Sequence, residues 1–172
     1  MFKKRNILLF LIIVAFGCST ESGPASVYEV AIDFSVINEN GEDLLAPTHP
    51  SAITEQNTDL YYSIDDSLVK QFHGNLDSPK MFFVSEEKSP FNEYYYMRIF
   101  SNIIDGEDMA LTYLEFEDNS MDTILTQYEQ GHNYTHLTKV WYNGDLKCDL
   151  YDKENTDLES NKYGTCYFVI TR

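Results

Sequence analysis

Strict alternation of apolar and polar side chains is the feature that most restricts the fold of this chain. Between Val27 and Asn38, apolar residues occupy every second position and mostly polar residues lie between them. Successive side chains of a β-strand point to opposite faces, so this pattern predicts a strand with one face in a core and one in water. The apolar positions are Tyr28, Val30, Ile32, Phe34 and Val36.

Shorter segments of the same kind follow, with turn sequences between them at intervals of about 8 to 12 residues. Asn40-Gly41 and Asn143-Gly144 are dipeptides typical of tight hairpins, because both residues tolerate a positive φ. No segment has a convincing helical period. The further predicted strands are 60–64, 68–72, 80–84, 93–101, 109–117, 122–128, 134–142 and 163–171, and the last, apolar on both faces, is expected to be central.

These segments predict an all-β domain over residues 27–172. An antiparallel two-sheet sandwich accounts best for many short strands separated by turns, and a β-barrel is the alternative. The abundance of aromatic residues, with 13 Tyr and 11 Phe, also favours strands.

The N-terminus reads as a secretory signal peptide over residues 1–17. Three basic residues precede an unbroken apolar run of ten residues, Ile7 to Phe16, which is too short to span a bilayer as a stable helix. Gly17-Cys18 at its end resembles a bacterial lipobox, in which the cysteine is lipidated after cleavage. The alternative is an ordinary signal peptide that leaves Cys18 as a free thiol. Residues 18–26, which are small and polar, are then the lipidated cysteine and a flexible tether.

The remaining cysteines predict a covalent link within the domain. If Cys18 carries lipid, Cys148 and Cys166 are left, and two thiols in an exported protein suggest one disulfide. A two-thiolate metal site is the alternative, although no nearby pair of histidines supports it.

The charge balance limits the partners. The chain has 12 basic and 28 acidic residues. Removal of the leader takes three basic residues and no acid, which leaves 9 against 28 and a net charge of −19. Binding to phosphates needs clustered Lys and Arg, so nucleic acid is not an expected partner. Cations, neutral sugars and basic proteins remain compatible with this surface.

Taken together, the chain resembles small uncharacterised surface lipoproteins of Bacteroidota. The likeness rests on the lipobox at Cys18, on the stretch 40–45 with the proline-containing loop that ends near Ile53, and on the stretch 140–144. Such proteins are similar to immunoglobulin-like sandwiches, and the resemblance implies no catalytic activity. It also implies an outer-membrane lipoprotein of the bacterial cell envelope, either periplasmic or surface-exposed.

Several motifs have some features of binding sites. The acidic turns 38–43 and 105–108 have spaced oxygen ligands, but they lack the bidentate Glu of a calcium loop and are expected to be plain turns. His132 and His136 would lie about 13 Å apart along a strand, which disfavours a shared metal. Ser67 and Thr123 fit a short O-glycosylation pattern. An exposed platform of Tyr94, Tyr96 and Trp141, with Tyr95 and Tyr142 beside them, would suit stacking against sugar rings, although core packing is the commoner role of such residues.

The sequence therefore predicts a non-catalytic, lipid-anchored envelope module with a structural or interaction role. No enzyme motif and no cofactor site is expected. The predicted partners are the membrane, through lipid on Cys18, and either a glycan or another envelope protein. The alternative function is a carbohydrate-binding surface lipoprotein that uses an exposed Tyr/Trp patch.

Overall fold

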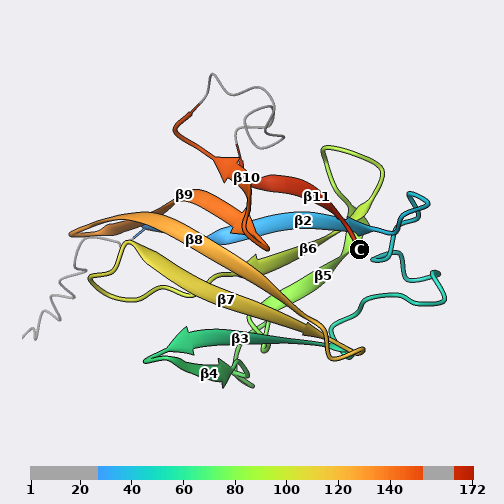
Figure 1. Ribbon diagram of the computed structural model, residues 1–172, viewed down its shortest axis with the longest axis horizontal. Helices are drawn as coiled ribbons and strands as arrows, with labels where there is room; N and C mark the ends of the chain where they lie inside the picture. Colours follow the sequence, from blue (N-terminus) through green and yellow to red (C-terminus); the bar gives the residue numbers. More distant parts are fainter. Residues whose placement is uncertain (1–26, 153–164) are drawn as a thin grey trace, which may run out of the picture.

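The structure, a computed structural model, describes residues 27–152 and 165–172, which form eleven strands and no helix (Figure 1). The predicted signal peptide, Cys18 and the tether lie outside the described residues. The strands are β1 (Val27–Glu29), β2 (Ala31–Ile37), β3 (Thr58–Ile64), β4 (Ser67–Lys70), β5 (Phe82–Lys88), β6 (Tyr95–Phe100), β7 (Met109–Phe116), β8 (Met121–Gly131), β9 (Tyr134–Tyr142), β10 (Asp145–Asp149) and β11 (Tyr167–Thr171).

The strands form two open sheets. The large sheet has the order β1-β9-β8-β7-β3-β4, with β10 also paired to β9, and the small sheet has the order β11-β2-β6-β5. The predicted all-β two-sheet sandwich is confirmed, and the barrel alternative is not formed. The expectation of purely antiparallel sheets is wrong at two places, because β1 pairs with β9 and β11 pairs with β2 in parallel. Both parallel pairs join segments far apart in the sequence, which local patterns do not reveal.

Alternating side chains of both sheets fill the space between them. Strand β7 buries every second residue, ending with Leu114 and Phe116, and leaves the residues between them on the outer face. Aromatic rings meet across the core: Phe34 of β2 lies 5.4 Å from Phe168 of β11 and 5.6 Å from Tyr142 of β9, measured between ring centroids. The interior is therefore one cluster of packed, mostly apolar side chains between the two sheets.

The first predicted strand is in fact divided between the two sheets. The chain leaves the large sheet after β1 and enters the small sheet at β2, and Val30 lies between them. The carbonyl of Val30 accepts hydrogen bonds from the backbone N–H and the hydroxyl of Ser101, which anchor this crossing point. Tyr28 consequently lies outside the core, with 64% of its surface exposed. The alternation correctly predicts extended structure here, but it does not reveal the change of sheet.

Strand β11 lies at the end of the small sheet, so the prediction of a central position is wrong. Its outer face is nevertheless covered. The hydroxyl of Tyr167 lies 2.7 Å from Ser35 Oγ and accepts a hydrogen bond from the side chain of Asn92, while the Phe91 ring packs against the Tyr167 ring. Both faces of β11 are therefore buried although it is an end strand, because a loop covers its outer face. This explains why the strand is apolar on both faces.

A disulfide between Cys148 and Cys166 joins the two sheets, as predicted. Cys148 belongs to β10 of the large sheet, and Cys166 directly precedes β11 of the small sheet. Both residues are buried, with 0% and 3% of their surfaces exposed. The disulfide thus holds the two sheets together beside β11, the end strand of the small sheet.

The two Asn-Gly turns differ. Asn143 and Gly144 both have positive φ, at 49° and 88°, as a tight hairpin between β9 and β10 requires. At the earlier turn only Gly41 has a positive φ, at 79°, and its N–H donates to the carbonyl of Asn38, so the expectation for Asn40 is wrong. The chain returns there through a single bridge between Ile37 and Asp43.

The long axis of the sandwich has two distinct ends. Val27 lies beside Tyr134 at the β8–β9 hairpin, whereas β9 reaches Tyr142 and the β9–β10 turn at the other end. Arg172 lies at this second end, beside the β7–β8 turn. None of the described residues belongs to a helix long and apolar enough to cross a membrane.

Candidate ligand-binding surfaces

The structure separates the aromatic residues that were predicted to form one platform. Trp141 is half-buried on the outer face of the large sheet, because its neighbours along β9 point into the core. Tyr96 lies on β6 of the small sheet, between residues whose alternation places it on the opposite side of the sandwich. Tyr94 lies just before β6, where its N–H donates to Asn92 Oδ1. These three residues therefore do not form a single patch.

The other two aromatics of that prediction face inward. Tyr142 is 5% exposed and donates a hydrogen bond of 2.7 Å to Asp122 Oδ2. Tyr95 packs against the core cluster. The structure assigns both residues a packing role.

A different aromatic surface covers the outer face of the large sheet. Trp141 on β9 pairs with Leu125 on β8, and Leu125 pairs with Leu111 on β7, so that the three side chains form one row. Tyr113 and Tyr61 are paired in the adjoining row. All are half-buried rather than fully covered. We call this surface, with Leu146 of β10 at the end of the first row, the aromatic face.

Sequence reasoning missed Tyr61 and Tyr113 as members of this face. The alternation along β7 contained the signal, since Ala110, Thr112 and Leu114 are inward and Tyr113 must then be outward. What the sequence lacked was the strand order that places Tyr61 beside Tyr113. The hydroxyl of Tyr61 donates a 2.6 Å hydrogen bond to Glu115, and this bond raises the pKa of Tyr61 to about 12.

An ion pair lies farther along the same face. Lys139 Nζ is 2.7 Å from a carboxylate oxygen of Asp149. Burial opposes ionisation of Asp149, but hydrogen bonds from Lys139 and from the backbone N–H groups of Asp152 and Tyr151 outweigh it, so the pKa of Asp149 lies below its ordinary value. The pair fixes β10 against β9 on the outer side of the sheet.

An exposed group of polar and aromatic side chains marks the β8–β9 hairpin. Glu129 accepts hydrogen bonds from the hydroxyls of Tyr134 and Tyr151, which lower the pKa of its carboxyl group. The His136 ring lies 4.9 Å from the Tyr134 ring, and its Nδ1 is 2.8 Å from Glu29 Oε2. This group offers flat rings next to hydrogen-bonding carboxylates at the edge of the sheet.

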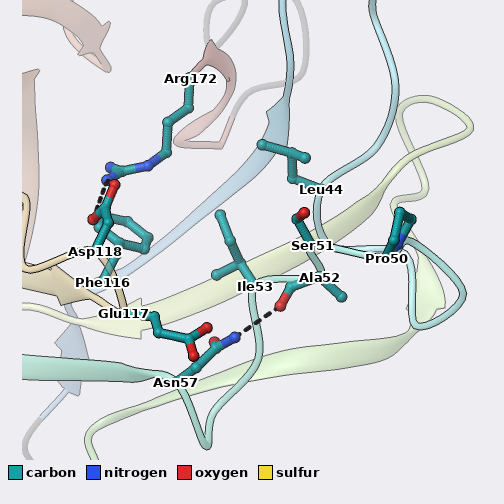
Figure 2. A pocket seen from close by; sticks show the side chains of 10 residues that line it. All are labelled: Leu44, Pro50, Ser51, Ala52, Ile53, Asn57, Phe116, Glu117, Asp118 and Arg172. Carbon is teal, nitrogen blue, oxygen red and sulfur yellow. Dashed lines mark hydrogen bonds and ion pairs between the residues drawn. The ribbon is translucent and has the colours of Figure 1, made fainter.

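The opposite end of the sandwich contains an open hollow of about 460 Å³ between the loop before β3 and the β7–β8 turn (Figure 2). Leu44, Ile53 and Phe116 provide its apolar lining, and Arg172 and Asp118 lie at one side. The Arg172 guanidinium carbon lies 3.7 Å from the centroid of the Phe116 ring. The planar guanidinium group of Arg172 is thus stacked on the Phe116 ring in a cation–π contact.

The positive charge of Arg172 in this hollow is already balanced by carboxylates. Arg172 donates to Asp122 at 2.7 Å, to Asp118 at 3.3 Å and to the hydroxyl of Ser120. An anionic ligand would have to displace these carboxylates, so the arrangement does not favour anion binding. Its evident role is structural, because Arg172 ties the end of the small sheet to the β7–β8 turn of the large sheet.

The acidic turn 38–43 uses its oxygen atoms internally. Asn38 Oδ1 accepts hydrogen bonds from the N–H groups of Asn40 and Glu42, and the two carboxylate oxygens of Asp43 accept from Leu45 and Tyr95. These bonds are those of a closed turn that holds its own backbone. Within residues 27–152 and 165–172, no three His, Cys, Asp or Glu side chains are grouped so that they could hold a metal ion.

The two predicted glycosylation positions have different surroundings. Ser67 is the exposed first residue of β4, whereas Thr123 is half-buried within β8 and its N–H donates to Asn143 Oδ1.

Comparison of the chain with protein-family models, with curated proteins and with solved structures finds no match.

Proposed function

We propose that this chain is a non-catalytic, lipid-anchored module of the bacterial cell envelope that acts by contact with another envelope component. The proposed anchor is lipid on Cys18, which follows the apolar leader directly. Lipid chains bind membranes in proportion to their buried methylene groups, by about 0.8 kcal/mol each. Several acyl chains on one cysteine would hold the domain firmly at the outer membrane.

The observation that best supports a contact role is the aromatic face. Trp141, Leu125 and Leu111 lie in one row across three neighbouring strands, and Tyr113 and Tyr61 adjoin it. These side chains are partly accessible although they are large and mostly apolar. A broad surface of this composition is typical of recognition by surface contact.

The orientation of the domain is compatible with this role. Val27, the first described residue after the proposed tether, lies at the β8–β9 hairpin end of the sandwich. With a tether of only residues 18–26, that end would face the membrane, and the side of the large sheet would remain open to partners. The acidic surface would oppose close contact with anionic lipids.

Replacement of the lipobox cysteine tests the anchor. In cells fed an alkyne analogue of palmitate, the wild-type protein should incorporate label and sediment with membranes. Cys18→Ala should remain unprocessed and unlabelled, whereas the adjacent control Ser19→Ala should behave as wild type. Equal labelling of the Cys18→Ala protein would contradict the proposal.

Carbohydrate binding is the second candidate function, and the half-buried Trp141 on an accessible sheet face is the observation that favours it. Flat rings stack on the apolar faces of sugars. Thr123 on the adjacent strand β8, and Tyr61 and Glu115 farther across the same sheet, can hydrogen-bond hydroxyl groups. A glycan array should identify a ligand whose affinity falls about tenfold in Trp141→Ala, the loss expected for a central aromatic contact. Tyr96→Ala is the matched control, because Tyr96 lies on the opposite side of the sandwich. Binding that is insensitive to Trp141, or absent from every glycan tested, would exclude this use of the face.

A further inference from the structure

The large sheet ends at an open edge strand, β4 (Ser67–Lys70). Strand β4 pairs with β3 on one side, and no strand of the described residues pairs with its other side. All four of its residues are exposed. An edge of this kind offers unpaired backbone groups on which an additional strand can form.

The register identifies the backbone groups that point outward. The N–H of Gln71 donates to the carbonyl of Leu60, so Gln71 and Leu60 form a hydrogen-bonded pair. Such pairs alternate along an antiparallel ladder, and Val69 therefore also bonds to β3. The N–H and C=O groups of Leu68 and Lys70 are thus directed away from β3, toward the open side.

The side chains around this edge are unusually apolar for an exposed strand. Five of the ten exposed large apolar side chains among the described residues fall between positions 64 and 76, and we call them the edge patch: Ile64, Leu68, Val69, Phe72 and Leu76. Phe72 is 68% exposed and Leu68 is 50% exposed. Beside the patch lies a hollow of about 240 Å³ whose lining includes Leu76, Met81 and Phe100.

Strand β4 also has few of the charged side chains that usually protect such strands. The one charged residue of β4, Lys70, is held 2.5 Å from Asp59, and Lys80 also contacts that carboxylate. By contrast, the edge strand β5 of the small sheet presents exposed Glu86 and Glu87. Proteins commonly protect a sheet edge with charged side chains, and β4 has only Lys70, whose charge is paired with Asp59.

Acidic residues flank the edge patch at both ends. Asp65 and Asp66 form the exposed turn before β4, and exposed Asp77 follows the patch. We propose that β4 is a docking site for an extended segment of a partner protein, which adds a strand to the large sheet and carries apolar residues at alternate positions and Lys or Arg at its ends. Pairing with a second copy would bring together like charges on a chain whose net charge is −16. This inference rests on the proposed role as an interaction module and names its partner class, and its own evidence is β4 with the residues that flank it.

Synthetic peptides provide a direct test that does not depend on the lipid anchor. The probe is a fluorescent peptide, Lys-Lys-Val-Thr-Val-Thr-Val-Lys-Lys, added to the full-length protein in mild detergent, with binding measured by anisotropy. One control peptide has Glu in place of every Lys, and another has N-methyl groups on all central residues. Strand addition requires both free N–H groups and basic ends, so only the first peptide should bind.

Amide hydrogen exchange locates the peptide on the protein. In the free protein, Leu68 and Lys70 should exchange quickly, while Val69 and Gln71 are protected by β3. Saturating peptide should slow exchange at Leu68 and Lys70 by about tenfold or more, because these N–H groups become hydrogen-bonded. Protection confined to other strands, or no protection with any peptide, would overturn the proposal.

Variants separate the contributions of backbone and charge. Leu68→Pro removes an outward N–H without removing a bond to β3 and should abolish binding. Leu68→Lys keeps the backbone intact but repels a basic segment, so it should also weaken binding. The second variant keeps the test valid if the first one misfolds.

Asp65→Asn/Asp66→Asn preserves a turn in which both residues have positive φ, and should weaken binding about threefold to tenfold. Glu86→Gln/Glu87→Gln, the same charge change on the β5 edge, should leave binding unchanged. Equal binding of the Glu-ended peptide, or a protein dimer that protects Leu68 and Lys70, would refute the basic partner.

Discussion

Replacing Cys148 and Cys166 with alanine should lower the free energy of unfolding by about 3 kcal/mol or somewhat more. The two cysteines are 18 positions apart. In the chain-entropy model, a crosslink that closes a loop of this length stabilises the fold by about 3 kcal/mol at 25 °C, because it restricts the unfolded chain. For a domain of this size, that corresponds to a decrease in Tm of about 6 to 12 °C.

Comparison of three forms of the protein distinguishes the stabilisation by the covalent bond from that by the packing of its sulfur atoms. Both cysteines are buried, so alanine also leaves a small cavity, which costs about 1 kcal/mol further. Reduced wild-type protein keeps both sulfur atoms in place and loses only the covalent link. Urea denaturation of the oxidised, reduced and doubly substituted proteins, followed by fluorescence of the single tryptophan, Trp141, would give the two contributions separately.

The reasoning would be refuted by a reduced protein whose free energy of unfolding lies within about 1 kcal/mol of the oxidised value. That result would mean that the unfolded chain already holds the two cysteines close together, so that the bond restricts it little. A large loss in the doubly substituted protein alone would instead assign the stabilisation to packing between β10 and β11.

Three further predictions concern polar contacts. Arg172→Ala should lower the free energy of unfolding by about 2 kcal/mol, and Arg172→Lys should recover less than half of the loss because it lacks the planar fork and stacking surface; full recovery in urea denaturation would contradict this role. The depressed pKa of Asp149 stabilises the fold above the ordinary carboxyl pKa of about 4, and this contribution is lost as the pH falls through the lower folded-state pKa. Lys139→Met should therefore show a flatter dependence of stability on pH below about 5, and an unchanged slope would argue against the ion pair. The hydrogen bond to Glu115 raises the pKa of Tyr61 to about 12, so its contribution to stability is complete below pH of about 10 and is lost as the pH rises through the folded-state pKa. Glu115→Gln should therefore move the tyrosinate absorbance of Tyr61 to lower pH. No movement would show that another group raises this pKa.

Some features of the candidate surfaces were accessible from local sequence, and others depended on strand order. Trp141 was among the aromatics expected on an exposed platform, and it lies on the outer face of β9 because Val140 and Tyr142 on either side of it are buried. Its grouping with Tyr94 and Tyr96 was wrong, since Trp141 lies on β9 of the large sheet whereas Tyr94 and Tyr96 lie just before and on β6 of the small sheet. Tyr61 was not selected at all, because only the pairing of β3 with β7 brings it beside Tyr113.

The edge patch illustrates the same limit. Leu68 alternates with Lys70 in a way that predicts a strand, and the structure confirms β4 at Ser67–Lys70. Nothing in those residues says whether a strand is internal or terminal in its sheet. Position in the sheet order makes this short apolar strand an exposed edge rather than part of the interior.

The sequence by itself determined the all-β class, most strand positions and the positive-φ turn at Asn143-Gly144, and it predicted the disulfide between Cys148 and Cys166. These properties follow from side-chain period, backbone preference and residue count, which act over a few neighbouring positions or on the whole composition. Tertiary structure alone decided that the first stretch changes sheets at Val30, that β11 joins β2 in parallel, and which faces and edges remain open. Those choices depend on contacts between residues distant in the chain, for which the local pattern contains no partner information.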